Sequence, residues 1–221
     1  MLHSNKTIPV MSSFLINSNR CMIPQSCRFL TTTARIKLSD RISAHLKSSK
    51  VMNTDKMPRA VSKFITHHPW SVRHVIGSDE VSLHNTVHAR AVDIRWSLVP
   101  TMGSNFAQSP RTTIPFTISV EDKLTPQGMI FRCSTKTGAS YRYVIERVTC
   151  FTSFAERDSF SSYYGPRFDT LEPTLQEAFD EVLHEWGMSG EVIDFIEASS
   201  QYYNNVEYVN WLCNINDFIS K

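Results

Sequence analysis

The sequence predicts an α+β protein in which an antiparallel sheet is followed by helices. Between residues 71 and 151, apolar and polar side chains alternate with a period of two, and short links with Gly, Pro, Asp and Ser separate the alternating segments. From residue 172 onward, apolar side chains recur three and four positions apart. Because a parallel crossover needs a dozen or more residues, the short links favour antiparallel neighbours. Strands followed by helices define the α+β class.

Composition limits the class of protein without indicating its function. The chain has 221 residues, 25.3 kDa and 41% apolar residues, which predicts one folded domain and excludes collagen, low-complexity disorder and a disulfide miniprotein. Five cysteines without a CxxC pair predict neither a disulfide framework nor a zinc site. The sequence has no run of 18 apolar residues, so we expect no membrane span.

The N-terminus resembles a targeting segment. The first 39 residues contain no Asp or Glu but carry five basic residues: Lys6, Arg20, Arg28, Arg35 and Lys37. Together with many Ser and Thr, this composition predicts a mitochondrial transit peptide over residues 1–37. Residues 28–33 resemble a two-step matrix presequence, which places the mature N-terminus near Leu38 and the folded domain at 38–221. The alternative is a disordered tail. Under both interpretations we expect residues 1–37 to lie outside the folded domain.

The first predicted elements are one short helix and a meander of strands. Ser39 is a plausible N-cap for a helix over residues 38–50, with Ile42 and Leu46 four positions apart. We expect residues 50–63 to be a linker. Strands are expected between about 70 and 153, six or seven in number, at 71–76, 81–87, 92–98, 114–120, 128–134 and 141–151.

The last third predicts helices over about 172–220. Pro173 suits a first helical turn, Gly187 a C-cap and Ser189 the next N-cap. The apolar stripe expected to face inward comprises Leu175, Ala178, Phe179, Val182, Leu183 and Trp186, followed by Val192, Ile193, Ile196 and Tyr203. Asn204 and Asn205 mark a position where the chain could bend or break. The final segment is apolar on two sides, which predicts packing against the sheet and a second subunit.

The search for catalytic chemistry finds no enzyme signature. GxSxG, HExxH, P-loop and GxGxxG patterns are absent. His84 and His88 have the spacing of a helical metal pair, but in a strand four residues span about 13 Å, too far for one zinc ion. The sequence therefore predicts no enzyme, no cofactor and no metal site.

Charge is divided unevenly along the chain and suggests two interaction surfaces. Residues 164–221 carry 11 acidic residues against Arg167 and Lys221, whereas residues 38–163 carry 16 basic and 10 acidic residues. A candidate acidic face for protein partners comprises Glu177, Asp180, Glu181, Glu185, Glu191 and Asp194. A candidate site for single-stranded RNA comprises Arg95, Arg132, Arg142, Arg147, Tyr141 and Tyr143. Ordinary solvated surfaces are the alternative for both.

Motifs in the last third carry a family resemblance. They are Tyr164-Gly165-Pro166-Arg167-Phe168, then Leu171, Leu175-Gln176 and Ala178-Phe179, and finally Glu207-Tyr208, Trp211-Leu212, Ile215 and Phe218. This pattern resembles the mitochondrial acidic matrix protein family, also called the mitochondrial glycoprotein family, whose relatives include the complement globular-head-binding protein. The resemblance covers residues 38–221, with its specific motifs at 163–221.

The resemblance implies a fold and a role. It implies a twisted sheet of about seven antiparallel strands, one N-terminal and two C-terminal helices, and a ring-shaped homotrimer in the mitochondrial matrix. It also implies a non-enzymatic, chaperone-like adaptor for ribosomal and RNA-processing proteins in mitochondrial translation, ribosome assembly and RNA processing. Residues expected to serve family packing and oligomer contacts are Tyr164, Gly165, Pro166, Phe168, Tyr208, Trp211, Leu212 and Phe218.

One departure from the family pattern concerns the loops between strands. Residues 99–112 contain no acid, and residues 135–140 contain Lys136, where family members usually carry long acidic loops. We therefore expect a divergent, less acidic member, for which contact with RNA is easier than for its relatives.

Overall fold

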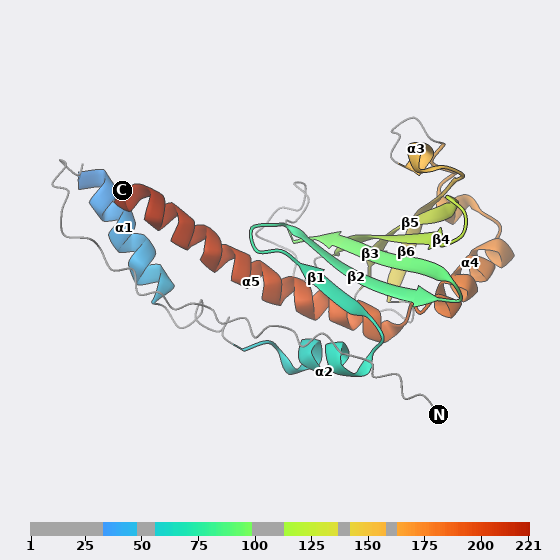
Figure 1. Ribbon diagram of the computed structural model, residues 1–221, viewed down its shortest axis with the longest axis horizontal. Coiled ribbons are helices and arrows are strands. Elements are labelled where there is room, and N and C mark those ends of the chain that lie inside the picture. The colour runs from blue at the N-terminus through green and yellow to red at the C-terminus, as the bar shows by residue number, and fades with distance from the viewer. Residues whose placement is uncertain (1–32, 48–55, 99–112, 137–141, 158–162) are drawn as a thin grey trace, which may run out of the picture.

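The computed structural model describes residues 33–47, 56–98, 113–136, 142–157 and 163–221. Two helices precede the sheet, α1 (Thr33–Leu46) and α2 (Arg59–His67). The strands are β1 (Ser71–His74), β2 (Glu80–Val87), β3 (Arg90–Ser97), β4 (Pro115–Asp122), β5 (Gly128–Thr135) and β6 (Tyr143–Phe151). After them come α3 (Phe154–Arg157), a 3-10 turn (Phe168–Thr170), α4 (Pro173–Glu185) and α5 (Gly190–Ser220). Figure 1 shows this order.

The six strands form one antiparallel meander in the order β1-β2-β3-β4-β5-β6. The predicted α+β class and antiparallel pairing are confirmed. The count of seven strands implied by the resemblance is wrong for the described residues. The segment before β1, expected to be a linker, instead forms α2, because Val61 and Phe64 lie three residues apart and bury one face of a helical turn.

One face of the sheet, here called the inner face, holds the core. Alternate residues of each strand are buried there, as the sequence alternation predicts, among them Leu83, Ile94, Ile118 and Phe131. The helices α4 and α5 cover this face: Phe131 meets Trp186 edge to face with ring centroids 6.1 Å apart. The opposite, outer face is covered by no helix along β1 to β3 among the described residues, and it carries the polar half of each alternation.

Helix α5 is one continuous helix of 31 residues, so Asn204 and Asn205 do not break it. Its first half lies beneath the sheet, and its second half extends well beyond the sheet beside α1, as Figure 1 shows. The two helices run antiparallel, because Arg35 of α1 donates to the Ile219 carbonyl at 2.6 Å and Ser39 donates to Asn216 Oδ1 at 2.8 Å. Helix α1 begins at Thr33, five residues before the predicted start at Leu38, and ends at Leu46.

A turn of two residues, His88 and Ala89, connects β2 and β3. His88 and Ala89 have φ values of +47° and +64°, the left-handed region that a type I′ turn requires at both central positions. His84 lies within β2 and His88 lies in the turn, so the two residues do not share the helical spacing of a metal pair.

Candidate functional site

The acidic side chains of α4 form a stripe that is open to solvent. Glu177, Glu181 and Glu185 are exposed, and their spacing of four residues aligns them along one side of the helix. None of the three makes a hydrogen bond or ion pair with a described residue. The buried Leu183 and Trp186 hold the opposite side of α4 against the sheet, whereas Leu175 and Ala178, expected to face inward, are exposed. We call Glu177, Glu181 and Glu185 the α4 stripe.

Asp180, expected in the same surface, instead turns toward the sheet. Its Oδ1 accepts a hydrogen bond of 3.3 Å from the Tyr143 hydroxyl of β6. Burial raises the pKa of the Asp180 carboxyl, while the bond from Tyr143 acts in the opposite direction. Burial also raises the pKa of the Tyr143 hydroxyl, with Asp180 adding to the effect. Asp180 is therefore part of the contact between α4 and the sheet.

The two acidic residues expected on α5 are engaged within the molecule. Glu191 lies 3.1 Å from His68, just after α2, and Asp194 pairs with Arg142 at the start of β6. Arg142 also lies 3.3 Å from Glu197. Glu191 and Asp194 therefore have partners within the molecule, unlike the α4 stripe, although their side chains are 70% and 59% exposed.

The candidate RNA residues separate between the two faces of the sheet. Arg95, Arg132 and Arg147 lie on the outer face. Arg142 and Tyr143 contact α5 and α4 respectively, on the helix side, and Tyr141 lies outside the described residues. The separation arises at a β-bulge, a register shift between Arg132 and Cys133 that leaves one extra residue in β6 and changes which face its side chains take.

The motif that begins at Tyr164 wraps around β6, the edge strand of the sheet. The Tyr164 ring lies 4.8 Å from the Arg132 guanidinium carbon on the outer face, while Phe168 is buried near Phe179 of α4. Gly165 has φ +71°, and a Cβ there would lie 2.5 Å from the Val148 carbonyl oxygen. Only glycine fits this close approach, so the motif covers the edge of the sheet.

The far half of α5 exposes large apolar side chains. Trp211 is 55% exposed and Phe218 is 79% exposed, while Leu212 on the α1 side is buried. Tyr208 stacks on Trp211 with ring centroids 5.9 Å apart, and its hydroxyl lies 3.2 Å from Nε2 of His45 in α1. The far half of α5 therefore has the second apolar surface that the sequence predicts, in addition to the surface that packs within the molecule.

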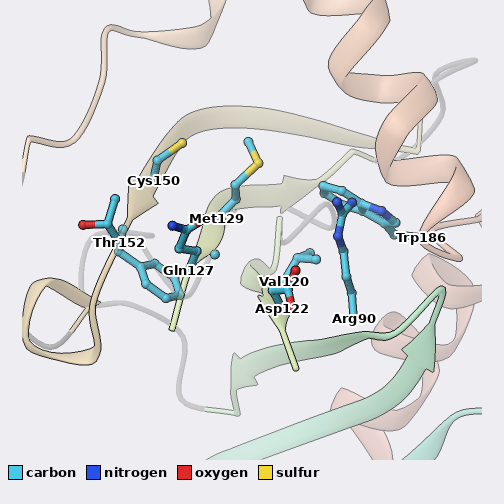
Figure 2. A pocket seen from close by; sticks show the side chains of 10 residues that line it. Arg90, Val120, Asp122, Gln127, Met129, Cys150, Thr152 and Trp186 are labelled. Carbon is cyan, nitrogen blue, oxygen red and sulfur yellow. The ribbon is translucent and has the colours of Figure 1, made fainter. Parts of the chain in front are cut away.

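An open pocket lies where the sheet meets the end of α4. It has a volume of about 330 Å³, and Figure 2 shows Arg90 and Trp186 side by side on one wall and Cys150 with Met129 across from them. The Arg90 guanidinium carbon lies 5.3 Å from the Trp186 ring centroid. Among the described residues, no group of three or more His, Cys, Asp or Glu side chains could hold a metal ion.

Sequence reasoning missed a half-buried pair that joins the sheet to the middle of α5. His74 Nε2 lies 2.9 Å from Glu207 Oε1, and Glu207 Oε2 accepts a hydrogen bond of 2.9 Å from the Gly77 amide. The side chains are 6% and 17% exposed. Glu207 belongs to a motif, but nothing in the sequence indicates that the β1–β2 turn reaches the helix, because that proximity depends on the tertiary fold.

The described residues thus form a six-stranded antiparallel meander with an exposed acidic stripe on α4 and an exposed apolar surface on the far half of α5. The chain belongs to the mitochondrial glycoprotein family, whose model matches residues 39–219. The predicted recognition is confirmed, and family membership indicates a mitochondrial protein. In the described part of the chain, no helix is long and apolar enough to cross a membrane.

Solved structures resemble this fold. A hypothetical protein from Leishmania major, described as a sequence homologue of the human p32 protein, has a TM-score of 0.66 and 16% sequence identity, covering 84% of this chain and 99% of that one. The Trypanosoma brucei p22 protein has a TM-score of 0.65 and 16% identity, covering 85% and 100%. At these identities the comparison establishes the shared fold.

Proposed function

We propose that this protein is a non-enzymatic adaptor of the mitochondrial matrix that binds basic surfaces of ribosomal or RNA-processing proteins through the α4 stripe. The observation that supports this proposal is the contrast between the acidic residues of the two helices. The carboxylates of α4 at Glu177, Glu181 and Glu185 have no partner among the described residues, whereas Glu191, Asp194 and Glu207 of α5 contact the rest of the fold.

The charge of the stripe fits this role better than a structural one. Three carboxylates at successive four-residue spacings repel one another, which destabilises an isolated helix slightly. A basic partner would relieve that repulsion and would be attracted before contact. The acid-free, basic composition of residues 1–37 supports the matrix location in this proposal, because it predicts a transit peptide.

Self-association as a homotrimer is the second part of the proposal. Trp211 and Phe218 are large and exposed, and their spacing of seven residues places them on one side of α5. Burying such side chains in an interface contributes about 1.5–3 kcal/mol each. A W211A/F218A variant is expected to shift the solution mass, measured by light scattering, from three times 25.3 kDa toward a single chain. A wild-type protein that is already monomeric would contradict the trimer.

Charge reversal tests the α4 stripe. The variant E177K/E181K/E185K should lose co-purifying mitochondrial ribosomal or RNA-processing proteins, quantified by mass spectrometry, while its circular dichroism remains that of the wild type. Asp180 is left unchanged because it contacts Tyr143.

The matched control reverses three exposed acids elsewhere. D40K/E80K/E146K changes the net charge equally, and its exposed residues lie on α1, β2 and β6. Retained partners in the control and lost partners in the stripe variant support the proposal. Equal recovery from all three proteins would exclude the α4 stripe as the docking surface.

A further inference from the structure

The outer face of the sheet carries a row of arginines that crosses all six strands. The strand register places Arg73 opposite Ser82, Ser82 opposite Arg95, and Arg95 opposite Thr117. Thr117 in turn lies opposite Arg132, and Arg132 lies opposite Arg147. Six residues from six strands therefore form one continuous line, and four of them are arginine. We call Arg73, Arg95, Arg132 and Arg147 the arginine row.

All four arginines belong to the outer face. Arg73, Arg95 and Arg132 each stand between residues that point into the core, as the buried Ile94 and Trp96 on either side of Arg95 illustrate. Arg147 reaches this face only because of the β-bulge: without the extra residue, it would share the inner face with the buried Ile145. The bulge therefore adds a fourth cation to the row.

Two features distinguish this row from scattered surface charge. Arg132 and Arg147 are direct cross-strand neighbours, and like charges so placed destabilise a sheet. The edge segment holds both, since the Tyr164 ring lies against Arg132 and the Gly165 carbonyl accepts a bond of 3.3 Å from Arg147. Between the arginines stand the short hydroxyl side chains of Ser82 and Thr117, so no bulky side chain interrupts the line on β2 or β4.

We propose that the arginine row binds the phosphate backbone of a single-stranded nucleic acid across the outer face of the sheet. Five steps of about 4.8 Å between strands make the row about 24 Å long, enough to follow several nucleotides of an extended strand. Guanidinium groups suit phosphate because they donate in a planar fork. Among the described residues, Asp93 is the carboxylate that pairs directly with the row, at 2.6 Å from Arg95, and Glu80 and Glu121 also act on Arg95 through their charge. Arg73 and Arg132 have no carboxylate partner in the described part of the chain, so the charge of the row is only partly compensated.

The row revises the candidate RNA residues expected from the sequence. Arg73 joins the set, while Arg142 and Tyr143 leave it because they contact α5 and α4. The aromatic contribution comes from Tyr164, outside the sheet. The α4 stripe belongs to a helix on the other face of the sheet, so this proposal does not depend on the proposed protein adaptor role.

Fluorescence anisotropy of the full chain with labelled oligouridine of about 20 nucleotides tests the row. The wild type should bind with an affinity that falls steeply with salt, and R73Q/R95Q/R132Q should bind about tenfold or more weakly, with its salt slope reduced by about 2. The control R41Q/K47Q/K63Q removes three exposed basic side chains from α1 and α2 with the same charge change, and it should bind like the wild type.

Single substitutions of Arg73 and cross-linking separate a loss of binding from a loss of folding. Arg73 is exposed and makes no hydrogen bond or ion pair with a described side chain, so R73E should fold normally and still weaken binding, whereas R73K should restore most of it. Ultraviolet cross-links should fall on β1, β3 and β5 and on Tyr164. The proposal is overturned if the row variant binds like the wild type, if the control loses as much, or if polyglutamate of equal length binds as tightly, which would assign the row to acidic proteins.

Discussion

The two halves of α5 show how one helix can serve two purposes. Near its start, the helix packs under the sheet, and its buried residues there are Val192, Ile193, Phe195, Ile196 and Ser199. Beyond Glu207, only Leu212 is buried among the described residues, while Trp211 and Phe218 are exposed. The sequence is apolar in both halves, so apolar composition alone does not distinguish the core from an interface. The near half stabilises the monomer, and the far half is available for association.

Replacing Phe195 should have the largest effect, because it removes a ring from the centre of the core. Phe195 stacks on Phe64 of α2 at 4.4 Å and meets Trp96 of β3 edge to face at 6.3 Å. F195A should lower the free energy of unfolding, measured by urea denaturation, by about 3–5 kcal/mol. W211A, in the far half, should lower it by less than about 1 kcal/mol in dilute protein. Similar losses from the two variants would remove the distinction between the halves.

The boundary between the halves lies at Glu207, where loss of the carboxylate should have the next largest effect. E207A leaves His74 and the Gly77 amide without their acceptor in a site largely shielded from water. Leaving these donors without an acceptor in a half-buried site should cost about 1–3 kcal/mol. E207Q should lose less, because its amide oxygen can still accept from Gly77.

Chemical denaturation of both Glu207 variants measures this difference, and hydrogen exchange locates it. The amides of the β1–β2 turn should exchange faster in E207A, while those of β4 and β5 remain protected. Unchanged exchange in the turn would show that the sheet holds the hairpin without α5.

The sequence predicts more of the fold than of the surfaces, and the reason is physical. Hydrophobic periodicity depends on local burial, so it predicts both kinds of element. The strands follow from alternation with a period of two, and the inward residues Val192, Ile193 and Ile196 of α5 follow from the helical period. The linker prediction for residues 50–63 is wrong over α2, because a helix of nine residues contains too few turns to establish a period. The break expected at Asn204 and Asn205 is absent because packing of the flanking turns outweighs local propensity.

Surface predictions depend on register and on tertiary contacts, which composition does not contain. The β-bulge in β6 moves Arg147 to the outer face and leaves Tyr143 on the inner one, so one prediction for both residues cannot hold. Likewise, Asp180 lies three residues from Glu177 on the same helix, yet only Asp180 meets the sheet. The number of arginines is readable from the sequence, but their alignment across six strands is not.

Replacing Asp180 should have the smallest effect on stability. This replacement distinguishes the side of α4 that meets the sheet from the exposed α4 stripe. Burial raises the pKa of this carboxyl above its ordinary 3.8, so the folded state binds the proton more tightly than the unfolded chain. The resulting stabilisation is fully present below pH 3.8 and is lost as the pH rises through the higher folded pKa. D180N should therefore gain stability relative to the wild type between about pH 3 and pH 7, measured by urea denaturation. E181Q, an exposed neighbour with the same loss of charge, should show no such gain, and an equal gain would indicate general charge repulsion along α4.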